Sequence, residues 1–276
     1  MAFMPIARQM RDVECGQFAR RTTRGSSGLA RIATAVGLVV VVATGCGSRS
    51  KAVAGCQVEP AAMCQGADLT RADLSNANLV RANVTLANLT DADLTGALLS
   101  EARLVGATLA HANLKRADLS RAALVTADLT DANLTDANLT DATVTRADLT
   151  GANASGANLA GANLGGSNLT RANLTGATLT SANLIGVRAR AANLSSAKLV
   201  GAILVDADLT DAVLVGADLG GANLIGANLI GANLARANLA GASFIGASMD
   251  AAGYSLAKQA GANTSGAVVG TPTTTR

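Results

Sequence analysis

The chain has 276 residues, of which 49% are hydrophobic, yet it contains no tryptophan, one tyrosine and three phenylalanines. Aromatic side chains normally supply much of the buried area of a globular core, so this composition excludes a core of large side chains and predicts a narrow one built from small parts. Residues 1–65 carry eight Lys/Arg against three acids, and residues 66–250 carry twelve against sixteen. A basic leader therefore precedes a mildly acidic body.

The first feature in chain order is an apolar run, Ile32–Ala43, which ends in the motif ATGC at Cys46. As a helix the run would be about 20 Å long, too short for a hydrocarbon core of about 30 Å but typical of the apolar region of a signal peptide. The ATGC ending resembles a bacterial lipobox. The resemblance implies that the Cys46 thiol is acylated, that Cys46 becomes the mature N-terminus, and that the exported chain is anchored to the membrane.

Several alternatives stay open for this leader. The apolar run can be an uncleaved signal anchor, or a stretch with no role in export. The pair Arg20-Arg21 permits a twin-arginine signal, and the long region before the apolar run permits a start at Met10. We assign residues 1–45 to the leader and signal peptide, and we expect the mature chain in the cell envelope.

Two further cysteines, Cys56 and Cys64, lie between the lipobox and the repeats. In a compartment outside the cytoplasm such a pair can form a disulfide. Metal binding would need more ligands than this segment offers. We assign residues 46–65 to a linker and an N-terminal cap.

From Ala67 to Met249 a five-residue unit repeats 37 times without a slip of register. Ala fills the first position in 35 units and Leu the third in 31, while Asp or Asn stands between them in 25, so the pattern is not an accident of composition. A helix would spread the leucines around its circumference, since five residues turn a side chain by about 140°. A flat strand would send successive units to opposite faces. A chain that turns a corner once per unit points every Ala and Leu to a central axis, and the sequence therefore predicts a parallel β-helix.

Charges at the fifth position of the unit test how many units make one coil, since stacked like charges repel. A spacing of 20 residues gives five opposite pairs and no like pair, and a spacing of 15 gives four opposite pairs and no like pair. At a spacing of 10 the signs are mixed. Two units per coil are excluded, and three and four stay open.

The motif A-[D/N]-L-[T/S]-x resembles that of the pentapeptide-repeat family. The resemblance implies an all-β fold, a right-handed, four-sided parallel β-helix with four units per coil. Residues 66–250 would then form about nine coils in a rod roughly 45 Å long. The fold is expected to place leucines such as Leu69 and Leu134 inside with the alanines, and Asp and Asn outside.

Two places break the pattern. Ala154 stands where Leu is expected. In the segment IGVRARAAN, Val187 and Ala189 replace the inward pair, and Arg188 and Arg190 flank Ala189. One interpretation is a local thin spot or bulge in the coil. The other is a basic contact patch formed by Arg188 and Arg190.

The C-terminal segment, residues 251–276, is expected to form a cap and a disordered tail. Larger side chains appear toward this end of the chain, at Phe244, Met249 and Tyr254, and the segment SLAKQA can form a short helix. A cap is needed because an open coil exposes apolar side chains and unpaired backbone. The tail from Thr264 is rich in small and polar residues, a composition typical of disorder.

The sequence offers little chemistry for catalysis. Its one histidine, His111, has no second histidine to work with, and no Cys, His or Asp cluster has the spacing of a metal site. Asp131, Asp136 and Asp141 would stand on successive faces, so they cannot act as an acid–base pair on one substrate. A tube filled with Leu and Ala also has no cavity for a substrate. We expect a protein that is not an enzyme and that binds no cofactor or metal.

Three functional hypotheses follow. The first is an exported, lipid-anchored scaffold with an unknown protein partner. The second comes from the family resemblance: some of its members mimic DNA and bind DNA gyrase, but that requires a strongly negative rod inside the cytoplasm, so nucleic acid mimicry is disfavoured here. The third is an exported module that binds cell-wall glycans or ligands, which the scarcity of aromatic residues disfavours.

Overall fold

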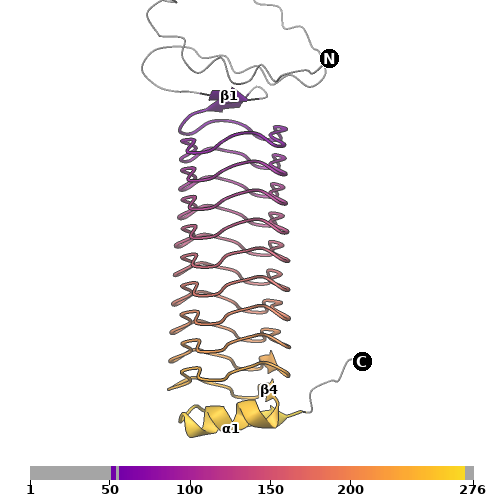
Figure 1. Ribbon diagram of the computed structural model, residues 1–276, viewed down its shortest axis with the longest axis vertical. Coiled ribbons are helices and arrows are strands. Elements are labelled where there is room, and N and C mark those ends of the chain that lie inside the picture. Colours follow the sequence, from indigo (N-terminus) through magenta and orange to yellow (C-terminus); the bar gives the residue numbers. More distant parts are fainter. Residues whose placement is uncertain (1–50, 54–55, 271–276) are drawn as a thin grey trace, which may run out of the picture.

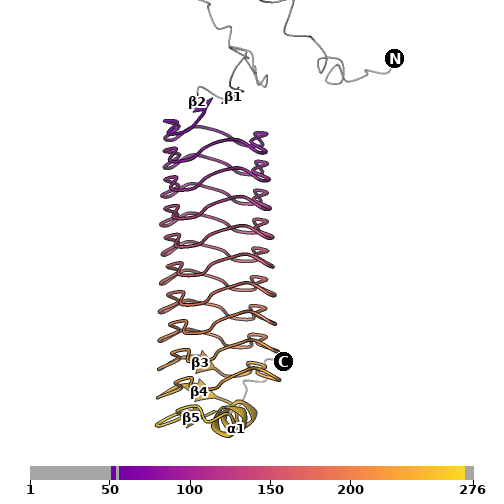
Figure 2. The same ribbon diagram turned by 90° about the vertical axis from the view of Figure 1, so that its left-hand side faces the viewer.

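The computed structural model describes residues 51–53 and 56–270, and these form a straight rod (Figures 1 and 2). At the N-terminal end lies an antiparallel hairpin of β1 (Lys51–Val53) and β2 (Cys56–Val58). At the other end lies helix α1 (Ala251–Gln259). Between them the chain winds in a stack of similar coils, so the predicted solenoid is confirmed.

Each coil takes twenty residues. The β-bridges pair residues in parallel at this spacing, as Asn83 with Arg103 and Arg103 with Ala123. Backbone hydrogen bonds follow the same register: the amide of Leu104 donates to the carbonyl of Ala123 at 2.7 Å, and that of Arg103 to the carbonyl of Ala82 at 2.9 Å. A coil therefore holds four five-residue units, the larger of the two sizes that the charge pattern leaves open.

The bridges of residues 56–270 form four ladders that run along the rod and begin at Met63, Asp68, Asp73 and Asn78. Each ladder residue is the second of its unit. Alternate side chains of an extended segment point the same way, so the fourth residue of the unit lies beside it on the outside. We name a face by the first residue of its ladder. The Met63 face consists of the ladder residues Met63, Asn83, Arg103, Ala123, Thr143, Asn163, Asn183, Ile203, Asn223, Ser243 and Asn263, each with the residue two positions later.

The corner of each unit is made by its fifth residue. This residue has a positive φ in every unit up to Gly246, whether it is glycine or a residue such as Arg81, with φ of 59°. The amide of Ala82 donates to the carbonyl of Leu79 at 2.9 Å across this corner. A positive φ at the third residue of such a hydrogen-bonded turn is the pattern of a type II turn, which explains why glycine is so frequent there.

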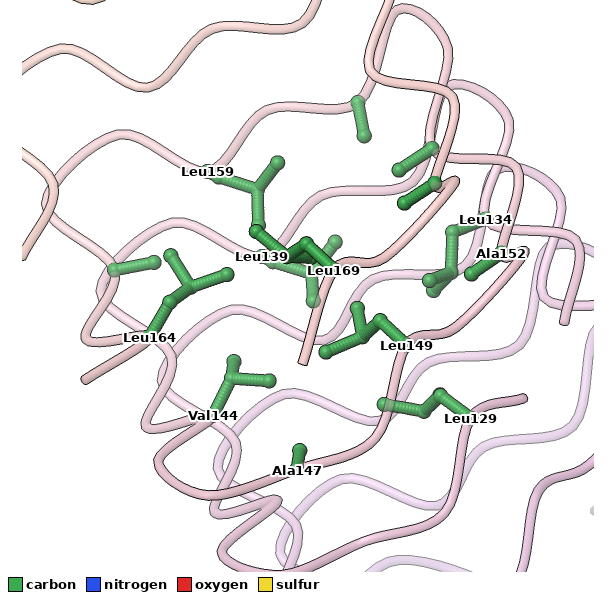
Figure 3. Packing of buried hydrophobic residues seen from close by; sticks show 14 of the residues in the cluster. Leu129, Leu134, Leu139, Val144, Ala147, Leu149, Ala152, Leu159, Leu164 and Leu169 are labelled. Atoms are coloured by element: carbon green, nitrogen blue, oxygen red, sulfur yellow. The ribbon is translucent and has the colours of Figure 1, made fainter. Parts of the chain in front are cut away.

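The core is a continuous column of the first and third residues of the units. Leu139 and Leu159 occupy the same position in successive coils, and Leu129 lies half a coil before Leu139. All three side chains point into the column (Figure 3), and each is at most 1% exposed. Val187 and Ala189, where the sequence pattern breaks, are also buried, and Arg188 keeps its bridges to Asn168 and Asp208. The ladder is therefore unbroken at this point, and no bulge forms there.

The N-terminal boundary predicted at residue 66 is too late by about one unit. Ala62, Met63 and Cys64 already form a unit, in which Cys64 is 3% exposed and occupies the position of the inward Leu. Met63 bridges Asn83. The unit was missed because it carries Met and Cys in place of Asp and Leu.

At the C-terminal end a helix does form where one was expected. Asp250 caps α1 by accepting from the amide of Gly253 at 2.7 Å. The disorder predicted from Thr264 is wrong as far as Gly270, because the chain returns to the coil after the helix. Strand β5 (Val268–Val269) pairs in parallel with β4 (Ser248–Met249), which pairs with β3 (Asn228–Leu229).

The corners allow a matched test of glycine. Gly156 and Gly176 occupy the same corner in neighbouring coils with the same φ of +67°, but a Cβ on Gly156 would lie 2.5 Å from Oδ1 of Asp136, whereas one on Gly176 would meet nothing within 4 Å. We expect Gly176→Ala to lower the free energy of unfolding by about 1 kcal/mol, the cost of a left-handed backbone for a residue with a Cβ.

Gly156→Ala is expected to cost more than Gly176→Ala in thermal and denaturant unfolding, because the Asp136 carboxylate must also move. Removing that carboxylate with Asp136→Ala in the Gly156→Ala chain should bring the loss back to that of Gly176→Ala. Equal losses for the two single variants would show that the Asp136 side chain does not restrict this corner.

Candidate interaction surface

The histidine and aspartates that the sequence analysis considered for catalysis are spread along the rod. His111 is exposed at a corner with φ of 59°. Asp131, Asp136 and Asp141 stand at successive corners, and each carboxylate leans over the corner glycine of the next coil. Between residues 56 and 270, no three His, Cys, Asp or Glu side chains are grouped closely enough to hold a metal ion. The structure thus brings no set of reactive side chains together in this part of the chain.

No helix among the described residues combines the length and the apolarity needed to cross a membrane. The predicted lipid attachment residue, Cys46, and the apolar run before it lie outside the described residues. Their roles stay predictions.

Most outward Asp and Asn side chains have a structural role. Oδ1 of Asp128 accepts from the amide and the hydroxyl of Thr130, at 3.0 and 2.7 Å. This bond fixes the two residues on either side of the inward Leu and recurs in many units. Amides also bridge neighbouring coils, as Nδ2 of Asn133 does to Oδ1 of Asn113 at 2.9 Å. The repeated Asp and Asn are therefore explained by the stability of the coil, without a ligand.

Exposed ion pairs link neighbouring coils at the expected spacing. The carboxylate of Glu101 lies 2.8 Å from Nε of Arg81 and 3.7 Å from the guanidinium of Arg121. A hydrogen bond from Arg81, its charge and, to a lesser extent, the charge of Arg121 hold the pKa of Glu101 below its usual value. Arg71 and Asp91 form a third pair at 3.4 Å. All three are open to water, where such pairs contribute little to stability.

The suggested contact patch, Arg188 and Arg190, lies on the Asp68 face. Both side chains are exposed, but the guanidinium of Arg190 is 3.7 Å from the carboxylate of Asp208 in the next coil. The positive charge of the two arginines is thus partly neutralised by Asp208. A role of Arg188 and Arg190 in binding stays a prediction.

Cys56 and Cys64 are joined by a disulfide, with their Cα atoms 5.0 Å apart. The bond ties β2 to the first coil. It belongs to the end of the rod rather than to any site on its wall.

The Met63 face differs from the rest of the wall in its chemistry. Its second and fourth positions from Met63 to Ser265 include no carboxylate and a single charged residue, Arg103. Eleven large hydrophobic side chains are exposed in the described residues, and six of them lie on this face or on the corner that closes it. These six are Met63, Leu86, Ile185, Ile203, Ile225 and Ile245, and the half-buried Val105, Val125 and Val205 continue the same row.

Sequence reasoning did not find this face. It followed only the charged fifth position from coil to coil. Reading the fourth position at a spacing of twenty would have shown that six of the eight residues from Val105 to Ile245 are aliphatic, because this spacing brings residues of one face together.

Comparison with known proteins agrees with this architecture. The family described as pentapeptide repeats matches residues 61–91, 87–124, 127–166, 157–191, 190–224 and 217–252. No curated protein matches the chain. Among solved structures, HetL, a pentapeptide repeat protein involved in heterocyst differentiation regulation from the cyanobacterium Nostoc sp. strain PCC 7120, is 36% identical. The match covers 70% of this chain and 89% of HetL, with a TM-score of 0.56.

Two more distant structures are also similar. QnrB1, a plasmid-mediated fluoroquinolone resistance protein, is 17% identical over 66% of this chain and 87% of its own, with a TM-score of 0.45. A pentapeptide repeat protein from the thylakoid lumen of Arabidopsis thaliana is 28% identical over 46% of this chain and 81% of its own, with a TM-score of 0.31. The family match spans most of the rod, and the repeat, the register and the likeness to HetL agree with it. The chain belongs to the pentapeptide-repeat family.

Proposed function

We propose that the protein is a non-enzymatic scaffold at the cell envelope, a stiff rod that is exported, held at the membrane by a lipid on Cys46, and active through contacts with other proteins. The finer geometry implied by the family, a right-handed, four-sided helix of about nine coils, is part of this proposal. The twenty-residue register supports it.

The observation that carries the proposal is the order of features along the chain. A basic region, a short apolar run and the ATGC motif come directly before the described rod, and that rod has no clustered reactive side chains. An N-terminal lipid would leave the wall of the rod free for contact. HetL is described as acting in the regulation of a differentiation process, and a role through protein contacts is in keeping with that.

Charge gives no support to DNA mimicry. Carboxylates are found on the Asp68, Asp73 and Asn78 faces and at the corners, and the Asp68 face also carries Arg188 and Arg190. A mimic of the DNA backbone needs a continuous row of negative charge.

The test is the location and mass of the protein in a bacterial host. We expect the unsubstituted chain in the membrane fraction, with an intact mass that corresponds to an acylated chain beginning at Cys46. The Cys46→Ser chain should lose the lipid, and the Cys15→Ser chain should keep it, because Cys15 lies in the removed leader. A soluble chain that keeps its leader in the cytoplasm would overturn the proposal, and inhibition of DNA gyrase would then be the next property to measure.

A further inference from the structure

We propose that the Met63 face is a self-association surface, on which a second copy of the chain packs antiparallel along the whole length of the rod. This inference concerns the wall of the rod and is independent of lipid attachment.

The apolar side chains of the face gather in two runs rather than being scattered, and Thr145 and Gly165 lie between the runs. Ile185, Ile225 and Ile245 are 45%, 37% and 39% exposed and occupy the fourth position of their units on the same ladder, with Val205 between them. Val105 and Val125 form the other run, toward the N-terminal end. An apolar patch of this kind marks an interaction surface more often than an inert wall.

The area of the face points to a partner that covers all of it. From Met63 to Asn263 the ladder extends over roughly ten steps of about 4.8 Å, so the face is about 48 Å long, and it is about 10 Å wide. Contact along the full length would bury on the order of 1,000 Å² over both copies, the lower limit for a specific interface. A partner that covers half of the face would fall below that limit. A second rod of the same length matches the requirement.

Full overlap of two antiparallel rods has one register, with the twofold axis at Asn163, the middle of the ladder. In this register the second positions meet one another across the axis. Arg103 lies opposite Asn223, and Thr143 lies opposite Asn183, so polar groups meet polar groups. Ile203 lies opposite Ala123. Between the two ends of the face, these are the one large and the one small apolar residue among the second positions.

The fourth positions also match in this register. Val105 lies opposite Ile225, and Val125 lies opposite Val205, so four of the six aliphatic side chains of the row cover one another, while Ile185 and Ile245 lie opposite Thr145 and Thr85. Gly165 also lies on the axis, beside Asn163, and its two copies bring no side chains together there. A surface that contacts itself about a twofold axis must be complementary to itself in this way.

The corners at the edge of the face are compatible with the same arrangement. In the N-terminal half they carry the long charged side chains Arg81, Glu101 and Arg121. Antiparallel overlap places these opposite Gly241, Gly221 and Gly201. The charges therefore keep their partners in their own rod and stay in contact with water.

A parallel pair of rods fits less well. It would bring the second position of each coil against the fourth position of the same coil of the partner. Arg103 would then cover Val105, and the amide of Asn223 would cover Ile225, so polar groups would lose water without gaining partners. The antiparallel arrangement is the one that the residues favour.

The first test compares Ile225→Lys with Val200→Lys by sedimentation equilibrium of the full chain with Cys46→Ser, so that no acyl chain contributes. Both are exposed β-branched residues at the fourth position, but Val200 lies on the Asn78 face. We expect a dimer for the parent and for Val200→Lys, and a dissociation constant at least tenfold higher for Ile225→Lys. Adding Val105→Asp to Ile225→Lys should restore association, because the two charges meet across the axis. A monomeric parent, or equal effects of the two lysines, would overturn the proposal.

The second test uses single cysteines in cells that express the full chain. Asn163→Cys lies on the predicted axis, and Asn158→Cys is its control on the Asn78 face. Each asparagine accepts from the amide two residues later, at 3.1 and 3.2 Å. A thiol cross-linker should join two copies through residue 163 and leave residue 158 at the background of the unsubstituted chain. Equal cross-linking at both would contradict the proposal. So would a monomer that binds vesicles of phosphatidylglycerol and phosphatidylethanolamine through Ile225, since the face would then be a lipid contact.

Discussion

The Leu139→Ala variant is expected to unfold with a free energy about 2–5 kcal/mol lower than that of the parent chain. Leu139 is completely buried, and Leu119 and Leu159 occupy the same position in the coils on either side. Coils above and below are joined by backbone hydrogen bonds, with Leu119 donating to Asn138 and Leu139 to Asn158, both at 2.7 Å. The backbone cannot close the space that the side chain leaves, so the cost includes both lost burial and a cavity.

The control for this variant is Thr140→Ala, one residue further and on the outside. This substitution removes the Thr140 hydroxyl, which donates to Oδ1 of Asn138 at 2.7 Å, but the amide of residue 140 keeps its hydrogen bond to the same oxygen. We expect a loss below about 1 kcal/mol for that variant. Because each coil contacts only its neighbours, amide exchange should rise most in the coils next to residue 139. A loss under 1 kcal/mol for Leu139→Ala would mean that the coil collapses around a missing leucine.

The fold was predictable from the sequence because a single physical constraint repeats along the chain. A unit of five residues places Ala and Leu inside only if the chain turns once per unit, and this argument needs no knowledge of distant contacts. The coil size did not follow in the same way. Ion pairs such as Arg81 with Glu101 are compatible with four units per coil, but charges spaced for three units would be equally satisfied. The family resemblance implied four units, and the backbone register shows them.

The ends were harder to predict than the middle because they depart from the repeat. Cys64 takes the place of an inward Leu, and the chain resumes its coil at Asn263 only after helix α1 has interrupted the pattern. The segment from Thr264 is rich in small and polar residues, so its composition alone predicted a disordered tail although the segment is ordered as far as Gly270. Strand β5 is ordered because its partner, β4, is already in place.

The candidate surface could not be recognised from the residues one by one. Ile225 and Val105 are unremarkable in sequence, since a single exposed aliphatic residue is normal on a protein surface. They form a surface only because the coil places residues that are twenty positions apart on the same face. The residues considered for catalysis were different: His111, Asp131, Asp136 and Asp141 stand at separate corners of the coil, and the five-residue repeat sufficed to predict that separation.

Removing the disulfide should loosen the N-terminal end of the rod and leave the C-terminal end unchanged. The bond closes a short loop with a sequence separation of 8, and a chain-entropy estimate gives about 2–3 kcal/mol for such a loop. Cys64 is also the inward residue of the first coil, and its amide donates to the carbonyl of Asn83 at 2.8 Å. We expect the Cys56→Ala/Cys64→Ala variant to lose amide protection in the first coils.

Reduction of the unsubstituted chain separates the two contributions of these cysteines. It breaks the bond but keeps both buried side chains, which are 2% and 3% exposed, so it should reproduce the entropic part of the loss without the packing part. Exchange near Leu69 should rise in the reduced chain and rise further in the double alanine variant, while exchange near Leu224 stays constant in both. If reduction leaves the amides near Leu69 as protected as before, the cap is held by the pairing of the first coil with the second, and the disulfide only follows the fold. If protection is lost along the whole rod, the coils unfold together, and the nearest-neighbour description of this solenoid is wrong.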